Sequence, residues 1–89
     1  MPERRVAIGS KVGLHARPAA LFVQEASKQS VPVTIAKDGT PPADARSILS
    51  VLALDARGGD EIILAAEGDG ADEALDALAE FVGRDLDAE

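Results

Sequence analysis

Alternating apolar and polar residues along the chain predict three short strands. In the segment Arg4–Ile8, the apolar residues Val6 and Ile8 lie on the same side, as the two-residue period of a strand requires. A second alternating series predicts another strand and consists of Val31, Val33 and Ile35. The clearest alternation covers Glu61–Glu67, where one face carries Ile62, Leu64 and Ala66.

A fourth, return strand is predicted only weakly. The pair Asp38-Gly39 follows the second strand and is a strong signal for a hairpin turn. Pro41-Pro42 comes next and lacks two backbone N–H donors, so a strand there must be short or lie at a sheet edge. Whether this strand forms is left open by the sequence.

Helical periodicity appears first between Ala16 and about Lys28. Pro18 stands in the first turn, where proline is tolerated because its missing N–H would have no helical partner. The apolar face recurs at intervals of three and four residues and consists of Ala19, Phe22, Val23 and Ala26.

Two further helices are predicted, each with a candidate N-cap. Ser47 would cap a short helix whose inner face is Ile48, Val51 and Leu52. Asp69 would cap the last helix, which Gly83 would end. Its first turn is acidic, as the helix dipole favours, and its apolar stripe is Ala71, Ala74, Leu75, Leu78, Phe81 and Val82.

The predicted order of elements is therefore β-α-β-β-α-β-α within 89 residues, a length that supports one domain covering residues 1–89. Each helix has one apolar face, and together the helices need one sheet face to cover. We expect an α+β open-faced sandwich, with an antiparallel four-stranded sheet and three helices on one side.

Charge is distributed unevenly along this chain of formal net charge −7. Residues 1–37 carry six Lys or Arg and two Asp or Glu, whereas residues 38–89 carry three and fourteen. An acidic chain with two aromatic residues is a poor candidate for binding nucleic acid. The basic first part can still attract a phosphate or an acidic partner.

Cysteine is absent, which excludes a disulfide scaffold, a thiolate metal site and a thiol nucleophile. The apolar runs are far shorter than the roughly 20 residues that span a bilayer, and the three apolar residues that follow Met-Pro-Glu-Arg-Arg lead us to expect no signal peptide. We therefore expect a soluble cytoplasmic protein without a membrane-inserted segment.

The single histidine, His15, directly precedes the first predicted helix and lies in the run Gly13-Leu14-His15-Ala16-Arg17-Pro18-Ala19-Ala20. The N–H groups of Ala16 and Arg17 at that helix start, together with the helix dipole, favour an anion. The guanidinium of Arg17 adds a fork of donors for phosphate oxygens. Because an imidazole with an ordinary pKa of about 6.5 is nucleophilic near neutral pH, the run predicts a phosphoryl acceptor.

Plainer interpretations of His15 remain at this point. A surface histidine at a helix start, with Arg17 in solvent, would have the same pattern. A metal site is excluded because the chain has no second histidine and no cysteine. No serine stands at a spacing that marks it as a hydrolase nucleophile with His15 as its base.

The ungapped run Gly13–Ala20 resembles the active-site motif of the HPr family, the histidine-containing phosphocarrier proteins of the bacterial phosphoenolpyruvate-dependent sugar phosphotransferase system. The chain length and the order of elements are also those of the family. Ala45–Leu49 resembles a second family signature, and Gly59–Ile62 resembles the entry to the last strand. The resemblance therefore extends over nearly the whole chain.

The resemblance implies that His15 is the phosphoacceptor, modified on Nδ1, and that Arg17 stabilises the phosphoryl group. The backbone N–H groups of Ala16 and Arg17 would receive phosphate oxygens. Enzyme I would donate the phosphoryl group and enzyme IIA domains would accept it. Such a protein is a stoichiometric carrier rather than an enzyme, needs no cofactor, and is expected to be a monomer.

The resemblance also implies a docking surface around His15, formed by Ala20, Ile48, Leu49 and Leu52. Leu49 lies off the inner face of its predicted helix, and an exposed leucine beside the active site favours a partner contact. For Ile48 and Leu52, a place in the core is the alternative.

Ser47 matches the serine that an ATP-dependent kinase phosphorylates in many Gram-positive members to regulate carbon catabolism. Two features depart from the family: Arg46 stands where many members have lysine, and the serine arrives one position later, after Thr40-Pro41-Pro42. The alternative role for Ser47 is a helix N-cap. Both can hold, because a phosphate at an N-cap suits the helix dipole yet repels acidic partners.

Three other functions stay open on the sequence alone. The chain could be a regulatory member that acts through Ser47 on a transcriptional partner, or a carrier for a nitrogen-linked or dihydroxyacetone branch. It could also be a small-molecule sensor, although no aromatic residues are available to line a pocket. The sequence names neither the sugar nor the enzyme IIA.

Overall fold

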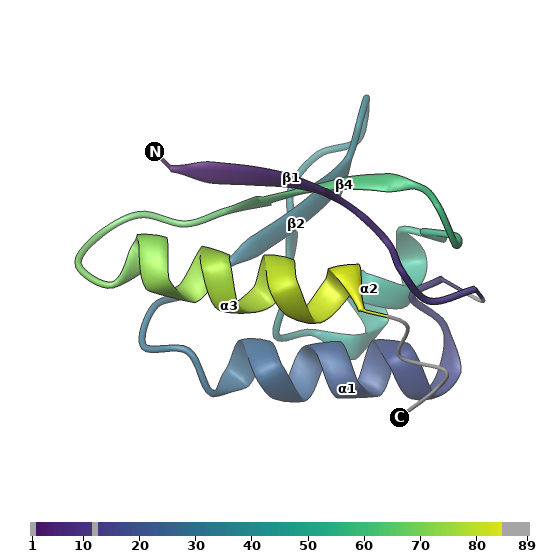
Figure 1. Cartoon of the computed structure of the whole chain (residues 1–89), viewed down its shortest axis with the longest axis horizontal. Helices are drawn as coiled ribbons and strands as arrows, with labels where there is room; N and C mark the ends of the chain where they lie inside the picture. The colour runs from purple at the N-terminus through teal and green to yellow at the C-terminus, as the bar shows by residue number, and fades with distance from the viewer. Residues whose placement is uncertain (1, 12, 85–89) are drawn as a thin grey trace.

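The structure, a computed structural model, describes residues 2–11 and 13–84. Within these residues, three helices cover one face of a four-stranded sheet (Figure 1), so the predicted α+β open-faced sandwich is confirmed. In chain order the elements are β1 (Glu3–Ala7), α1 (Ala16–Ser27), β2 (Thr34–Lys37), β3 (Ala43–Asp44), α2 (Ile48–Ala53), β4 (Glu61–Ala65) and α3 (Ala71–Gly83).

The sheet has the order β1-β4-β2-β3, and every neighbouring pair is antiparallel. Val6 of β1 pairs with Ile62 of the central strand β4, and Ile35 of β2 pairs with Leu64. β4 ends two residues earlier than the pattern predicts, but the expected inward face is correct, since Ile62, Leu64 and Ala66 are all buried.

One apolar cluster lies between the sheet and the helices. α3 buries the complete stripe predicted from its sequence. From α1, Ala19, Phe22 and Ala26 are buried, whereas Val23 packs against the cluster while partly exposed. Because α1 is fixed along its whole length by this core, the residues at its first turn have a defined position.

The predicted bounds of the first two strands are wrong by small amounts. β1 covers Glu3–Ala7 instead of Arg4–Ile8, since Ile8 already leaves the β1–β4 pairing, and its N–H donates to the Asp60 carbonyl at 2.9 Å. The second strand begins at Thr34 and excludes Val31 and Val33. Pro32 lies between these two valines and has no N–H to offer a ladder, although both side chains pack in or against the core.

The uncertain return strand does form, as the two-residue β3 at the edge of the sheet. The hairpin turn before it has Gly39 at φ 84°, and the Thr40 N–H donates to the Lys37 carbonyl at 3.0 Å. Pro41 and Pro42 precede the paired residues, so the ladder starts only after them. The edge position and the short length are what two missing donors impose.

The predicted inner face of α2 is wrong in two of its three members. Val51 is fully buried, but Ile48 is 38% exposed and Leu52 is 37% exposed. A helix of six residues offers little more than one turn to the core. Only Val51 points inward far enough to be covered.

The predicted N-cap of α3 is also wrong. The cap is Gly70 at φ 92°, with no side-chain capping hydrogen bond, and Asp69 is exposed one residue earlier. A left-handed glycine turns the chain into the helix at this point, so the carboxylate of Asp69 stands outside the capping position.

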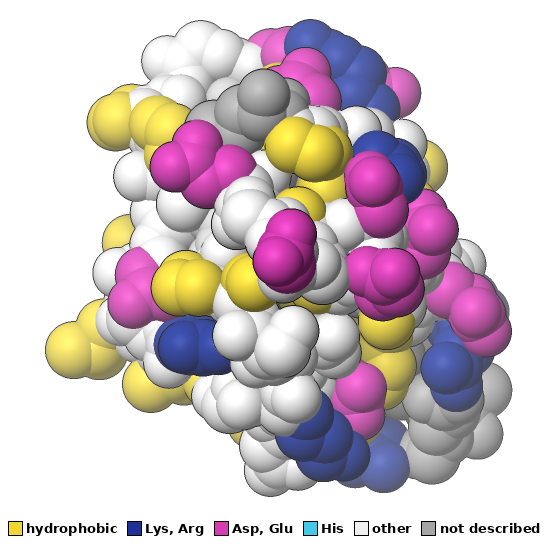
Figure 2. Space-filling view, turned by 90° about the vertical axis from the view of Figure 1, so that its left-hand side faces the viewer, with side chains coloured by type: hydrophobic (Ala, Val, Ile, Leu, Met, Phe, Trp, Pro, Cys, Tyr) yellow, Lys and Arg dark blue, Asp and Glu magenta, His cyan; other side chains and the backbone are white. Residues whose placement is uncertain are grey.

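Acidic side chains are spread over the end of the molecule where α3 begins, with basic side chains among them (Figure 2). The Arg4 guanidinium of β1 bonds Asp72 at 3.2 Å and Asp76 at 3.0 Å, both on the outer side of α3. These exposed pairs add little stability. In the described part of the chain, no helix has the length and hydrophobicity needed to cross a membrane.

Candidate functional site

His15 is the N-cap residue of α1, and its backbone is extended with φ −130° and ψ 158°. Its side chain makes no capping hydrogen bond to the helix and is 39% exposed. Arg17 is exposed in the first turn, and Pro18 is buried there. Because first-turn N–H groups have no helical carbonyl to bond, this helix start presents donors and a positive dipole end beside the imidazole.

The backbone before His15 is fixed by close packing against residues 56 and 57. Gly13 has φ +76°, and a Cβ at this position would lie 2.2 Å from the Ala56 carbonyl oxygen. The Leu14 N–H donates to the same carbonyl at 2.8 Å, and the Leu14 side chain is fully buried. Only glycine fits both the left-handed backbone and the close approach.

The contact between the two loops is equally tight from the other side. A Cβ on Gly58 would lie 2.5 Å from the Lys11 carbonyl oxygen and 2.7 Å from that of Ser10. The chain before α1 and the chain after α2 therefore touch backbone to backbone. This contact fixes the position of the His15 backbone relative to the residues that follow α2.

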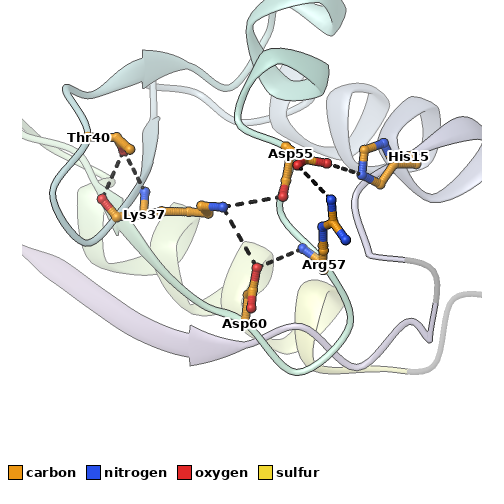
Figure 3. Close-up of polar contacts among 6 residues, drawn as sticks. All are labelled: His15, Lys37, Thr40, Asp55, Arg57 and Asp60. Atoms are coloured by element: carbon orange, nitrogen blue, oxygen red, sulfur yellow. Dashed lines mark hydrogen bonds and ion pairs between the residues drawn. The ribbon is translucent and has the colours of Figure 1, made fainter.

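A polar network joins the His15 ring to the loop after α2 (Figure 3). His15 Nε2 lies 3.1 Å from Asp55 Oδ1, and Arg57 Nη2 lies 3.1 Å from Asp55 Oδ2. Lys37 Nζ donates to the Asp55 carbonyl at 3.3 Å and lies 3.8 Å from Asp60 Oδ2. The Arg57 N–H donates to the same Asp60 oxygen at 2.9 Å.

The hydrogen bond from the Arg57 guanidinium lowers the pKa of the Asp55 carboxyl below its ordinary value of 3.8, with smaller contributions from the charges of His15 and Lys37. Asp55 is therefore ionised at neutral pH and can only accept hydrogen bonds. A neutral ring with its proton on Nε2, the atom that faces this acceptor, has its lone pair on Nδ1.

The predicted docking residues are exposed to different extents. Leu49 is 77% exposed, as expected for a residue off the inner face of α2, and Ile48 and Leu52 are exposed by more than a third. Ala20 is exposed on α1, which packs against α2. Among residues 2–11 and 13–84, these three α2 side chains are the exposed large hydrophobic ones.

Ser47 is the N-cap of α2, as the sequence predicts, and its Oγ accepts from the Ser50 N–H at 3.2 Å. Its neighbour Arg46 turns toward the end of α1 and donates to the Gln29 carbonyl at 2.8 Å. A cation is stabilising near the carbonyls at a helix C-terminus.

Asp55 is the site residue that the sequence patterns do not reveal. Its contact with His15 joins positions 40 residues apart, and neither hydrophobic periodicity nor the His15 motif points to it. One local signal existed: Asp55 follows a short helix, at a position where glycine or asparagine usually ends the helix. Within the described residues, no group of three His, Cys, Asp or Glu could hold a metal ion.

Comparisons with known proteins identify the family of this chain. The family model described as PTS HPr component phosphorylation site matches residues 2–84. The phosphocarrier protein HPr of Streptomyces coelicolor is 52% identical over 87 residues, which cover 98% of this chain and 94% of the relative. The HPr-like protein Crh of Bacillus subtilis is 41% identical over 86 residues, which cover 97% of this chain and the whole relative.

The fold gives the same result. The crystal structure of HPr from Thermoanaerobacter tengcongensis superimposes with a TM-score of 0.85 at 44% identity, covering 92% of this chain and 91% of that one. A family model over almost the whole described chain, close relatives and a shared fold point to one group of proteins. The chain belongs to the HPr phosphocarrier family of the phosphotransferase system.

Proposed function

We propose that this protein carries a phosphoryl group on Nδ1 of His15, received from phosphorylated enzyme I and passed to a sugar-specific enzyme IIA domain in the cytoplasm. One observation carries the proposal. The His15 side chain stands at the start of a 12-residue helix without capping it. The imidazole and the helix N–H groups can therefore act together on one phosphoryl group.

Transfer on this proposal depends on position and charge. The lone pair of His15 Nδ1 forms the N–P bond while the bond between phosphorus and the donor breaks. The backbone N–H groups of Ala16 and Arg17 and the Arg17 guanidinium hold the phosphoryl oxygens at the positive end of the α1 dipole. No acid–base pair has to act on the phosphoryl group itself, and the protein serves as a stoichiometric carrier that uses no cofactor.

We further propose that partners dock on the exposed apolar residues of α2, with Leu49 at the centre and Ala20, Ile48 and Leu52 around it. An exposed apolar patch beside a reactive group is typical of a protein-binding surface. One small face would have to serve donor and acceptor in turn, so each interface should be transient. The carrier would act as a single-domain monomer.

The experiment is phosphorylation by phosphoenolpyruvate and a bacterial enzyme I, followed by intact mass measurement. We expect one phosphoryl group, lost in acid, and none on the His15→Ala variant, whose melting temperature should stay near that of the parent. A panel of enzyme IIA domains from sugar, nitrogen-linked and dihydroxyacetone systems then identifies the acceptor. Failure to accept from an enzyme I that phosphorylates another carrier would overturn the proposal.

A second candidate function is regulation through Ser47, which the similarity to Crh, the catabolite repression HPr of Bacillus subtilis, supports. Ser47 is half-buried at the start of α2 and directly precedes the exposed patch. A phosphate there would change the charge of the surface on which partners dock. Incubation with ATP and an HPr-directed serine kinase should modify the parent and leave Ser47→Ala unmodified; an unmodified parent would contradict this function.

A further inference from the structure

Asp55 occupies an unusual position for an aspartate on two counts. Helix α2 ends at Ala53 with Leu54 as its C-cap, and Asp55 follows with φ 51°. Among the described non-glycine residues it is the one with a positive φ. Glycine is the usual residue at this position, and a carboxylate at the C-terminal end of a helix opposes the dipole. A carboxylate that opposes the dipole at a position where glycine is usual is a reason to look for a function.

The surroundings hold the Asp55 carboxylate in one orientation (Figure 3). Its two oxygens have different partners, with Oδ1 at 3.1 Å from His15 Nε2 and Oδ2 at 3.1 Å from Arg57 Nη2. Lys37 Nζ bonds the Asp55 carbonyl at 3.3 Å, which fixes the backbone of the same residue. The carboxylate is thus directed at Nε2 of the ring, the nitrogen that the proposed phosphoryl transfer does not use.

We propose that Asp55 is a positioning residue for phosphoryl transfer: it holds the His15 ring with the proton on Nε2 and stabilises the positive charge that the ring acquires when Nδ1 is phosphorylated. This proposal rests on the proposed function, because it assigns a role within the same transfer. It also gives a role to an aspartate at a position where glycine is the usual residue.

The charge balance of the step shows what the carboxylate contributes. A neutral ring with its proton on Nε2 attacks phosphorus through the Nδ1 lone pair, and the N–P bond forms as the bond to the leaving group breaks. The Nε2 proton stays in place, so the phosphorylated ring is cationic beside an anionic Asp55. In the reverse step the N–P electron pair returns to Nδ1, and the ring becomes neutral again.

A small phosphoryl donor separates this chemistry from docking. Phosphoramidate transfers its phosphoryl group to the imidazole and releases ammonia, without a protein partner. The rate constant for this reaction is measured for the parent, Asp55→Gly, Asp55→Asn and Asp60→Asn. The last variant is the matched control, because it removes a carboxylate from the same loop that bonds Arg57 and Lys37 but does not contact His15.

We expect the rate constant to fall roughly tenfold in both Asp55 variants, because both remove the negative charge 3.1 Å from His15 Nε2 that would stabilise the cationic ring. The Asp60→Asn variant should stay within twofold of the parent, a smaller change than the one expected for Asp55. The melting temperature of Asp55→Gly should not fall, since glycine suits the left-handed backbone. Slower transfer in an equally stable protein is a result that a purely structural role would not give.

A spectroscopic readout tests the same contact without any transfer. His15 is the single histidine, so its ring nitrogens are unambiguous in a proton–nitrogen NMR spectrum. In the parent and Asp60→Asn, the neutral ring should carry its proton on Nε2. In Asp55→Gly, the two nitrogen shifts should move toward the mixture of tautomers of an unrestrained side chain, whereas the amide oxygen of Asp55→Asn can still accept from Nε2–H.

Unchanged ring shifts and rate constants in both Asp55 variants would overturn the role of Asp55. That outcome would leave the proposed function intact if enzyme I still phosphorylates the parent. Conversely, a parent that reacts with phosphoramidate but not with phosphorylated enzyme I would contradict the proposed function, while the variant series would still decide the role of Asp55.

Discussion

Two helices of this protein begin at residues proposed to accept phosphate, and their N-caps are built differently. Both cap residues have extended backbones, with φ −130° at His15 and φ −105° at Ser47. The Ser47 hydroxyl accepts a hydrogen bond from its own helix at 3.2 Å, whereas the His15 ring makes no such bond. A cap side chain that accepts a hydrogen bond from its own helix stabilises the fold. A cap side chain that makes no such bond does not occupy the helix start, where a ligand can then bind.

The His15 ring is held by a tertiary contact and not by a hydrogen bond to its own helix. The Asp55 carboxylate contacts the ring from one side, and the Gly13 backbone packs against Ala56 beneath it. The comparison teaches that the reactive residue depends on a neighbouring loop for its position, whereas Ser47 depends on its own helix. The predictions below test this difference from its largest expected effect to its smallest.

The largest effect is expected for Gly13→Ala. The added Cβ would overlap the Ala56 carbonyl at 2.2 Å, and the left-handed φ of +76° disfavours alanine. We expect a loss of about 2–4 kcal/mol of unfolding free energy, measured by urea denaturation, together with slower phosphorylation of His15.

Gly39→Ala is the matched control for this variant. Gly39 has φ +84°, but a Cβ there would meet nothing within 4 Å. The Gly39→Ala substitution should lower the free energy of unfolding by about 1–2 kcal/mol, the cost of alanine in a left-handed backbone. It should leave the phosphorylation of His15 unchanged. Equal losses of unfolding free energy and of phosphorylation rate in the two variants would show that the contact between the loops does not position His15.

The next effect concerns Leu49, which is 77% exposed on α2. With this protein as the substrate of enzyme I, Leu49→Ser should raise KM about tenfold, the equivalent of about 1.4 kcal/mol of docking energy. The kcat of enzyme I should stay the same. The unfolding free energy should change by less than about 0.5 kcal/mol, as for most surface substitutions. A lower kcat at unchanged KM would place Leu49 outside the docking surface.

The comparison itself predicts losses of stability of different size at the two caps. Ser47→Ala should lose about 1 kcal/mol, because the Ser50 N–H loses its acceptor. His15→Ala should change the unfolding free energy by less than about 0.5 kcal/mol. Urea denaturation of both variants checks this, and a larger loss in His15→Ala would show that the ring does support α1.

How much of this could be read from the sequence depends on the range of the interaction. The stripe of α3, the buried face of β4 and the N-cap at Ser47 follow from local periodicity and side-chain chemistry, and the structure confirms them. The start of the helix after His15 also follows from a local signal, because Pro18 stands in its first turn. Short-range rules are sufficient for these features.

The features that could not be predicted depend on contacts across the fold or on backbone angles. Asp69 fails as a cap because Gly70 adopts φ 92° and becomes the N-cap itself. Ile48 and Leu52 are exposed because only one side chain of the short helix α2 is fully covered by the core. Asp55 meets His15 only after α2 and the loops have packed, so no local pattern encodes the contact.

The smallest expected effect is a pH dependence of stability at Asp55. Ion pairing with Arg57, and the nearby charges of His15 and Lys37, lower the Asp55 pKa in the folded state below 3.8. A depressed carboxyl pKa stabilises the fold at pH values above the unfolded pKa, and this contribution is lost as the pH falls through the folded pKa. The parent should therefore be more stable than Asp55→Asn above pH 3.8, and the gap should close in stronger acid.

Melting temperatures measured across this range check the sign. Asn is the suitable replacement because it has the same size and also tolerates a left-handed backbone. A gap that widens as the pH falls would contradict the ion pairing. The lowered pKa belongs to the exposed carboxyl of Asp55, so added salt should reduce the difference in melting temperature between the parent and Asp55→Asn.

The most direct test of the central claim is to locate the phosphoryl group. The protein is labelled with nitrogen-15, phosphorylated with phosphoenolpyruvate and enzyme I, and examined by phosphorus and nitrogen NMR. We predict one phosphoryl group coupled to Nδ1 of His15, with the proton still on Nε2. A phosphoryl group on Nε2, or on a residue other than His15, would contradict the account.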